Sequence, residues 1–415
     1  MSITSTVLEN GVRIVAEHVP SMRSCTLGIW CENGSRHESD ELSGISHFIE
    51  HMMFKGTDKM DAEQLAQEFD AIGGGVNAFT TKENTCYYVK TLDEYLDKGA
   101  ELLAHMYFDS VFTKENTDLE RGVIIEEIGM YEDTPEDVAN ELLTAAMYEG
   151  CSLARPILGT RETLKAIDEN VLMDYYKKNY TPKNTLVSIA GGFSEESLEK
   201  IKKIFSKMQG GDGPKMPEAQ YKSAFAVKQR DTEQNHIYMA FPAIPLGDDR
   251  RYALQVLNNI LGGGMSSRLF QTVREKNGLC YTVYSFVSSA TGTGVLGIYV
   301  ATNKNTEHKA VKLICDECRK MTEGVSEEEF IRAKQQIKAS ALMSLENTAT
   351  RMTNNAKNMI VYGRAVTAEE MEKGYDSVTM EDIKNLAKEI FDFSKVSLSA
   401  VGKVSDVEEY KNSAK

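Results

Sequence analysis

Hydrophobic positions along the chain follow strand and helix periodicities, and the order of these patterns occurs twice. In the first half, RSCTLGIWCENGS and NTCYYVKTL predict strands, and ISHFIEHMMFKG predicts a helix that ends at glycine. In the second half, QNHIYMAFPAIPL and VLGIYVAT predict strands, and RRYALQVLNNILGGG predicts the matching helix. A longer helix follows in each half, in ENTDLERGVIIEEIGMYED and EEEFIRAKQQIKASALMSLEN. The repeated order predicts a duplicated α+β unit.

A segment rich in glycine and proline, SKMQGGDGPKMPEAQY, separates the two halves. The chain has 415 residues, which is more than one hydrophobic core usually serves. We therefore predict an N-terminal domain over residues 1–207, a linker over residues 208–220 and a C-terminal domain over residues 221–415. The predicted fold class is α+β: two similar domains, each with a mixed, largely antiparallel sheet and helices packed on one side.

Composition and charge restrict the class of protein. Hydrophobic content is 41% and charged content 26%, as in ordinary globular proteins, and the net charge of −15 argues against nucleic-acid binding. The sequence has no run of 18 apolar residues, so no membrane span is expected. The N-terminus, MSITSTVLENGVRIVAEHVPS, predicts a strand, an Asn-Gly turn and a second strand rather than a signal peptide. We expect a cytoplasmic protein with no nucleic-acid or membrane partner.

The seven cysteines do not resemble a disulfide framework, because their number is odd and they are widely spread. Cys315 and Cys318 form a C-x-x-C pair inside a predicted helix, and no second pair follows to complete a four-thiolate zinc site. We expect both to be reduced helix residues.

The candidate chemistry lies in the first predicted helix. His47 and His51 are four residues apart and Glu50 is three residues after His47, so all three share one helical face. Two imidazoles on one face can occupy two corners of a tetrahedral zinc site, with Glu50 beside a metal-activated water. The second half has apolar residues at the matching positions: Ala253, Val256 and Leu257. We therefore expect one Zn²⁺ per chain, in the first domain.

A catalytic zinc site needs a third protein ligand, and the helix predicted in TDLERGVIIEEIGMYED contains the candidates. Glu120 and Glu127 are seven residues apart and share one face, whereas Glu126 points about 100° away from Glu127. Periodicity therefore favours Glu127 as the ligand and leaves Glu126 as an alternative.

The segment GISHFIEHMMFKGT resembles the active-site helix of the pitrilysin/insulinase-type metallopeptidases, the inverzincins, whose motif is H-x-x-E-H. The chain is similar to the mitochondrial processing peptidase-like bacterial branch of this family over nearly its whole length. The resemblance implies zinc held by His47, His51 and Glu127, with Glu50 as general base and Glu120 in contact with the ligands.

Two further segments resemble the same family. GGGVNAFTTKENTCYYV is similar to its edge strand beside the zinc, which implies that Asn77, Ala78 and Phe79 bind a peptide substrate as an added strand. GGGMSSRLFQTVREKNGLCYTVYSF matches a segment whose Arg and Tyr, here Arg274 and Tyr281, stabilise the developing oxyanion.

The resemblance implies a zinc-dependent endopeptidase that hydrolyses peptides or unfolded, presequence-like segments, using metal-activated water and Glu50 as general base. Because the zinc motif and the Arg/Tyr pair occur in one chain, we expect a homodimer rather than an obligate pair of different chains. The alternative is a non-catalytic structural or partner subunit of the same fold.

Overall fold

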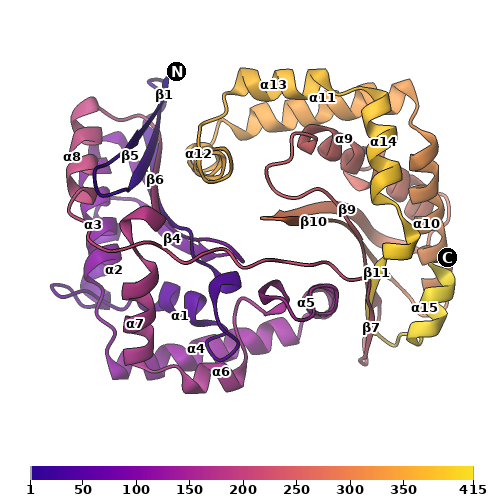
Figure 1. Ribbon diagram of the computed structural model, residues 1–415, viewed down its shortest axis with the longest axis horizontal. Coiled ribbons are helices and arrows are strands. Elements are labelled where there is room, and N and C mark those ends of the chain that lie inside the picture. The colour runs from indigo at the N-terminus through magenta and orange to yellow at the C-terminus, as the bar shows by residue number, and fades with distance from the viewer. Residues whose placement is uncertain (1, 415) are drawn as a thin grey trace. The chain divides into compact units, whose positions relative to one another are not determined.

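The computed structural model describes residues 2–414, which form two compact units (Figure 1). Unit 1 runs from the N-terminus to Ile128 and includes Arg155–Pro217 and Met343–Val366. Unit 2 contains Gly129–Ala154, Glu218–Leu342 and the chain from Thr367 onward. The predicted boundaries at residues 207 and 221 stay a prediction. In the structure, each unit also contains one segment from the other half of the sequence: Met343–Val366 in unit 1 and Gly129–Ala154 in unit 2.

Unit 1 is built on a six-stranded sheet with the order β1-β2-β6-β3-β5-β4. Its strands are β1 (Ser2–Val7), β2 (Arg13–His18), β3 (Ser24–Cys31), β4 (Gly75–Thr80), β5 (Thr85–Leu92) and β6 (Thr185–Gly191). Strands β2 and β6 are parallel, and the other neighbours are antiparallel. The helices of this unit are α1 (Ile45–Met52), α2 (Ala62–Ala71), α3 (Leu96–Asp109), α4 (Lys114–Glu132, whose last turn belongs to unit 2), α6 (Arg161–Ala166), α7 (Glu169–Asn179), α8 (Glu195–Phe205) and α12 (Thr348–Tyr362).

Both faces of the unit 1 sheet are covered, which explains why β3 is buried from Cys25 to Cys31. Leu27 and Ile29 of β3 lie in the core that also contains α1 and α3. Trp30, on the other face, packs in a separate cluster with Met352 of α12, and its indole nitrogen lies 3.3 Å from the Met352 sulfur. The close approach needs a glycine at position 28, where a Cβ would lie 2.5 Å from the same sulfur.

Unit 2 contains a five-stranded sheet with the order β7-β11-β8-β10-β9. Its strands are β7 (Phe225–Gln229), β8 (Asn235–Pro242), β9 (Cys280–Ala290), β10 (Thr293–Thr302) and β11 (Ser397–Gly402). Its helices are α5 (Pro135–Met147), α9 (Arg251–Gly262), α10 (Glu307–Glu323), α11 (Glu327–Ser344), α13 (Ala368–Ser377), α14 (Met380–Ile390) and α15 (Val407–Ser413). Helices α9, α10 and α14 share one core with the sheet, and α5 packs on its other face (Figure 1).

The two sheets have the same strand order once β1 is set aside. Numbered within each unit from β2 and from β7, both sheets read 1-5-2-4-3, and in both the first and fifth strands are parallel. The predicted α+β fold with two duplicated domains is thereby confirmed. The structure adds one helix on the second face of each sheet: α12 in unit 1 and α5 in unit 2.

Two smaller expectations concern the linker and the cysteines. The described chain has no helix or strand between Phe205 and Phe225, in agreement with the composition of the predicted linker. All seven cysteines are free, and Cys315 and Cys318 are buried in α10. Among the described residues, no helix combines the length and the apolar character needed to span a bilayer.

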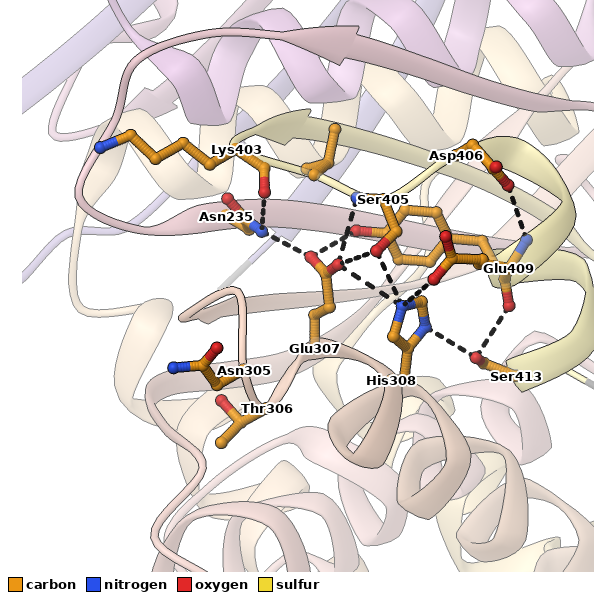
Figure 2. A network of polar contacts seen from close by, with 12 residues as sticks. Asn235, Asn305, Thr306, Glu307, His308, Lys403, Ser405, Asp406, Glu409 and Ser413 are labelled. Atoms are coloured by element: carbon orange, nitrogen blue, oxygen red, sulfur yellow. Dashed lines mark hydrogen bonds and ion pairs between the residues drawn. The ribbon is translucent and has the colours of Figure 1, made fainter.

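A buried carboxylate attaches the C-terminal helix of unit 2 to the rest of that unit (Figure 2). Glu307, at the start of α10, is fully buried and accepts hydrogen bonds from Asn235, from the Tyr410 hydroxyl at 2.7 Å and from the Ser405 hydroxyl at 2.7 Å. Because an unpaired buried carboxylate is costly, the three donors together stabilise the junction of β8, α10 and α15.

A buried ion pair attaches α12 to the unit 1 sheet. Glu17 of β2 and Arg351 of α12 are 6% and 8% exposed, and the Arg351 guanidinium donates to the Glu17 carboxylate. Asn355 donates to the other carboxylate oxygen at 2.8 Å. Removing one partner of such a pair leaves a buried charge without compensation.

We predict that Arg351→Leu lowers the free energy of unfolding by about 3–5 kcal/mol, because Glu17 would stay buried without its cation. Urea unfolding followed by circular dichroism measures the change. Lys183→Ala is the control, since Lys183 and Asp212 form a pair in which both side chains are mostly exposed, and its effect should stay below about 1 kcal/mol. Equal effects of the two substitutions would contradict the role assigned to Arg351.

Candidate metal and catalytic site

Helix α1 is oriented by its apolar positions. Four residues spaced at i, i+3, i+4 and i+7 are fully buried in the unit 1 core: Ile45, Phe48, Ile49 and Met52. Their burial fixes the rotation of the helix, so that His47, Glu50 and His51 project together from its opposite face.

The carboxylate of Glu127 on α4 lies opposite the two imidazoles of α1. Its Oε2 atom is 3.7 Å from His47 Nε2 and 3.7 Å from His51 Nε2. Within the described residues, these three side chains form a group whose potential ligand atoms all lie within 4.8 Å of one another. The structure thus brings together the three residues that the sequence predicts as metal ligands.

The spacing of the three donors fits a tetrahedral zinc ion. Ligands about 2.0–2.1 Å from zinc at tetrahedral corners are separated by roughly 3.3 Å. The 3.7 Å separations are close to this value and are longer than a hydrogen bond. Two nitrogens and one carboxylate oxygen are also the donor types of catalytic zinc sites, which leave a fourth position for water or substrate.

Protonation at the site also suits metal binding. Burial, together with the neighbouring His51, lowers the pKa of His47 to about 3. His47 is therefore a neutral imidazole near neutral pH, and this is the form that coordinates a metal.

Glu120 orients the second imidazole. Its carboxylate lies 3.1 Å from His51 Nδ1, which directs the Nε2 atom of His51 toward Glu127. Glu120 is 5% exposed, and its other oxygen lies 2.6 Å from the Lys55 ammonium. The sequence prediction placed Glu120 beside the ligands but missed Lys55, which follows His51 by four residues and lies just beyond the end of α1.

Glu50 is held by a residue that the sequence prediction also missed. The Thr80 hydroxyl, from β4, donates to Glu50 Oε2 at 2.5 Å. Burial raises the pKa of Glu50, and the Thr80 hydrogen bond opposes that effect. Thr80 directly follows the quoted segment Asn77–Phe79, but only the fold brings it to α1.

The alternative ligand, Glu126, lies on the exposed side of α4. Ile124 is fully buried and anchors the helix in the unit 1 core, whereas Val123 is 49% exposed. Ile128, next to Glu127, is also buried in this core, so the face that contains Glu120 and Glu127 is bordered by two buried apolar residues. The geometry favours Glu127 over Glu126 as a ligand.

A second group with metal-ligand side chains lies at the end of α3. It contains Asp58, His105 and Asp109. His105 already contacts Asp109 at 2.7 Å through Nδ1 and the Thr57 hydroxyl at 2.9 Å through Nε2. Because both ring nitrogens have hydrogen-bond partners, this group is a weaker candidate than the first.

Strand β4 forms the edge of the unit 1 sheet, as expected for a strand that binds a peptide. The Asn77 side chain accepts a hydrogen bond from the backbone N–H of Ala78 at 2.8 Å. The Phe79 ring points to the face covered by α12 and packs against Trp30, with the ring centroids 5.4 Å apart. A cavity of about 230 Å³ borders Phe79, Tyr88 and α12.

Arg274 and Tyr281 lie side by side in unit 2. The Arg274 guanidinium, on the π-helix Phe270–Glu275, stacks between two rings at 4.6 Å from the centroids of Phe270 and Tyr281. Tyr281 is 74% exposed. Because the proposed zinc ligands belong to unit 1, the action of this pair in the same reaction stays a prediction.

Comparison with known proteins agrees with this architecture. Residues 13–161 match the model of the family described as insulinase (peptidase family M16), and residues 166–337 match the model described as peptidase M16 inactive domain. The chain is 41% identical to "Uncharacterized zinc protease YmxG" of Bacillus subtilis, over 92% of this chain and 94% of the relative. It is 36% identical to "Uncharacterized zinc protease SCO5738" of Streptomyces coelicolor, over 98% and 90% of the two chains.

The solved structures include one of a protease from Helicobacter pylori that has the same fold. It matches with a TM-score of 0.89 and 22% identity, over 97% of this chain and 99% of that chain. The expected resemblance to the pitrilysin/insulinase-type peptidases is confirmed by the family models and by relatives that are similar over nearly the full length. The chain therefore belongs to the insulinase family of peptidases, peptidase family M16.

Proposed function

We propose that the chain is a zinc-dependent endopeptidase that hydrolyses peptides or unfolded, presequence-like segments. The observation that carries the proposal is the convergence of His47 Nε2 and His51 Nε2 on Glu127 Oε2, at 3.7 Å each. The names of the relatives, uncharacterized zinc proteases, support zinc as the metal and peptide bonds as the substrate. The three-donor arrangement favours a peptidase over a non-catalytic structural or partner subunit.

His47, His51 and Glu127 would hold one zinc ion per chain. The matching helix of unit 2, α9, has buried apolar residues where α1 has His47, Glu50 and His51. When bound, zinc supplies a Lewis acid that lowers the pKa of water and polarises a carbonyl group. Glu50 acts as general base: it takes the proton of the attacking water and transfers it to the leaving amine. Thr80 orients Glu50 for this transfer, and Glu120 orients His51.

The substrate backbone pairs with the free edge of β4 as an added strand, at residues Asn77–Phe79. This mode uses main-chain groups, so it accepts many side chains and requires an extended, unfolded segment. The Ala78 N–H, which bonds to the Asn77 side chain in this structure, would instead bond to the substrate. Arg274 and Tyr281 would donate hydrogen bonds to the oxyanion that develops on the scissile carbonyl.

The proposals for the assembly and the compartment rest on the sequence alone. We propose a homodimer of identical chains, each with its own metal site and its own Arg274–Tyr281 pair, acting in the cytoplasm. Nucleic acid is not a proposed partner, since the net charge is −15, and a membrane is not proposed, since the sequence has no run of 18 apolar residues.

The first prediction concerns the third ligand. Glu127→Ala should remove most of the zinc from the purified protein, because two imidazoles alone make an incomplete site. Glu126→Ala is the matched control, one residue away on the exposed side of α4, and should keep about one zinc per chain. Atomic absorption of dialysed protein measures both, and loss of zinc from Glu126→Ala alone would show that the ligand was assigned wrongly.

The second prediction separates the base from the ligands. Glu50→Gln should keep its zinc and lose activity by at least about 10²-fold, because the amide cannot accept a proton. Mass spectrometry of peptide-library cleavage, with and without a chelator, measures the activity. Wild-type activity in a zinc-loaded Glu50→Gln variant would exclude Glu50 as the base.

The third prediction concerns the oxyanion. Tyr281→Phe keeps the ring that stacks on Arg274 and removes only the hydroxyl, so folding and zinc content should not change. Turnover should fall by about 10–10³-fold if the hydroxyl stabilises the transition state. Steady-state kinetics on a fluorogenic peptide would reveal the loss, and an unchanged kcat would remove Tyr281 from the mechanism.

A further inference from the structure

The start of helix α1 is bonded to a buried carboxylate that precedes it by six residues. Glu38 is 4% exposed, and its two oxygens each accept one backbone hydrogen bond: Oε2 from Gly44 N and Oε1 from Ser46 N, both at 2.8 Å. Gly44 and Ser46 are the N-cap and the second residue of the helix that carries His47, Glu50 and His51.

No side chain at the start of α1 could accept these two hydrogen bonds in place of Glu38. Its N-cap is a glycine with φ of 95°, which has no side chain to accept a hydrogen bond, and its first turn has no acidic residue. The backbone N–H of Ile45 bonds to the carbonyl of Leu42. Glu38 accepts the hydrogen bonds of its two neighbours, the N–H groups of Gly44 and Ser46. The helix is only eight residues long, so its position depends strongly on this end.

The environment of Glu38 makes its charged form costly. Burial raises its pKa to about 7, above the ordinary 4.5, and the bonds from Ser46 and Gly44 and the charge of Arg155 oppose the rise. Arg155 also bonds to the backbone carbonyl of Glu38 and to Asp40, and the charge of Glu38 contributes to the raised pKa of Tyr175. Because folding favours the protonated form, the unfolding free energy falls as the pH rises from about 4.5 to about 7. Ionisation of Glu38 therefore lowers the free energy of unfolding rather than raising it.

We propose that Glu38 is a positioning residue that fixes the start of α1 and thereby the placement of both imidazole ligands. The expected effect on zinc binding rests on the proposed function. The effect on the start of α1 does not, because it can be measured in the absence of metal. Glu38 acts through the backbone of Gly44 and Ser46, so it touches neither the metal nor the substrate.

The test compares two substitutions of the same kind in unit 1. Glu38→Gln replaces one carboxylate oxygen by an amide that cannot accept the second backbone bond. Glu17→Gln is the matched control, since Glu17 is 6% exposed and contacts α12 instead of α1. In metal-free protein, the amide hydrogen exchange of residues 45–52, taken relative to that of β3 in the same variant, should be about tenfold faster in Glu38→Gln than in Glu17→Gln. The reference to β3 removes the general loss of unit 1 stability that Glu17→Gln also causes.

The second measurement is zinc affinity, from competition with a chromophoric chelator. Glu38→Gln should bind zinc about tenfold more weakly than wild type, and Glu17→Gln should bind as wild type. If Glu38→Gln does not fold, Glu38→Asp replaces it: the shorter side chain keeps the negative charge near Arg155 but cannot reach both backbone N–H groups. Glu38→Asp should show the same faster exchange of α1 and the same weaker zinc binding. Equal exchange of α1 in the Glu38 and Glu17 variants would overturn the inference. A wild type that binds no zinc would instead refute the proposed function, and the exchange result would still decide the role of Glu38.

Discussion

The proposed site depends on the contact between one face of α1 and one face of α4. Burial of four apolar side chains sets the rotation of α1, and burial of Ile124 and Ile128 sets that of α4. With both rotations set, two imidazoles and one carboxylate meet at 3.7 Å, a separation that suits ligands of one small cation. Neighbouring groups orient these side chains. Glu120, which contacts Lys55, bonds to His51, and the Thr80 hydroxyl bonds to Glu50.

The duplicated fold shows how one topology supports two different roles. Both sheets have the same strand order, and α1 and α9 occupy equivalent places on them. Helix α9 has Ala253, Val256 and Leu257 buried where α1 has polar groups, so its face serves only packing. The architecture therefore supplies a scaffold in both units, and the proposed metal ligands and general base, His47, His51, Glu127 and Glu50, all lie in unit 1.

Local patterns were sufficient to predict strands such as β3, β5, β8 and β10, the helices that pair across the two halves and the spacing of His47, Glu50 and His51, because periodicity acts over a few residues. Strands β6, β7, β9 and β11 were not predicted. The sequence also indicated Glu127, although periodicity alone left Glu126 open. The contact of Thr80 with Glu50, thirty residues away, was missed because nothing local in β4 shows that it meets α1. The contact of Glu38 with α1 was missed as well, because it depends on how the loop before the helix folds back. For the same reason, the exchange of α5 and α12 between the units was not predicted, since their docking depends on the completed sheets.

X-ray absorption at the zinc edge of the purified chain tests the central claim most directly. The account predicts nitrogen and oxygen ligands at about 2.0–2.1 Å, with the outer-shell signal of two imidazoles. A sulfur shell at about 2.3 Å, which would point to thiolates such as Cys315 and Cys318, would contradict it. A chain that retains no zinc after loading would contradict it equally.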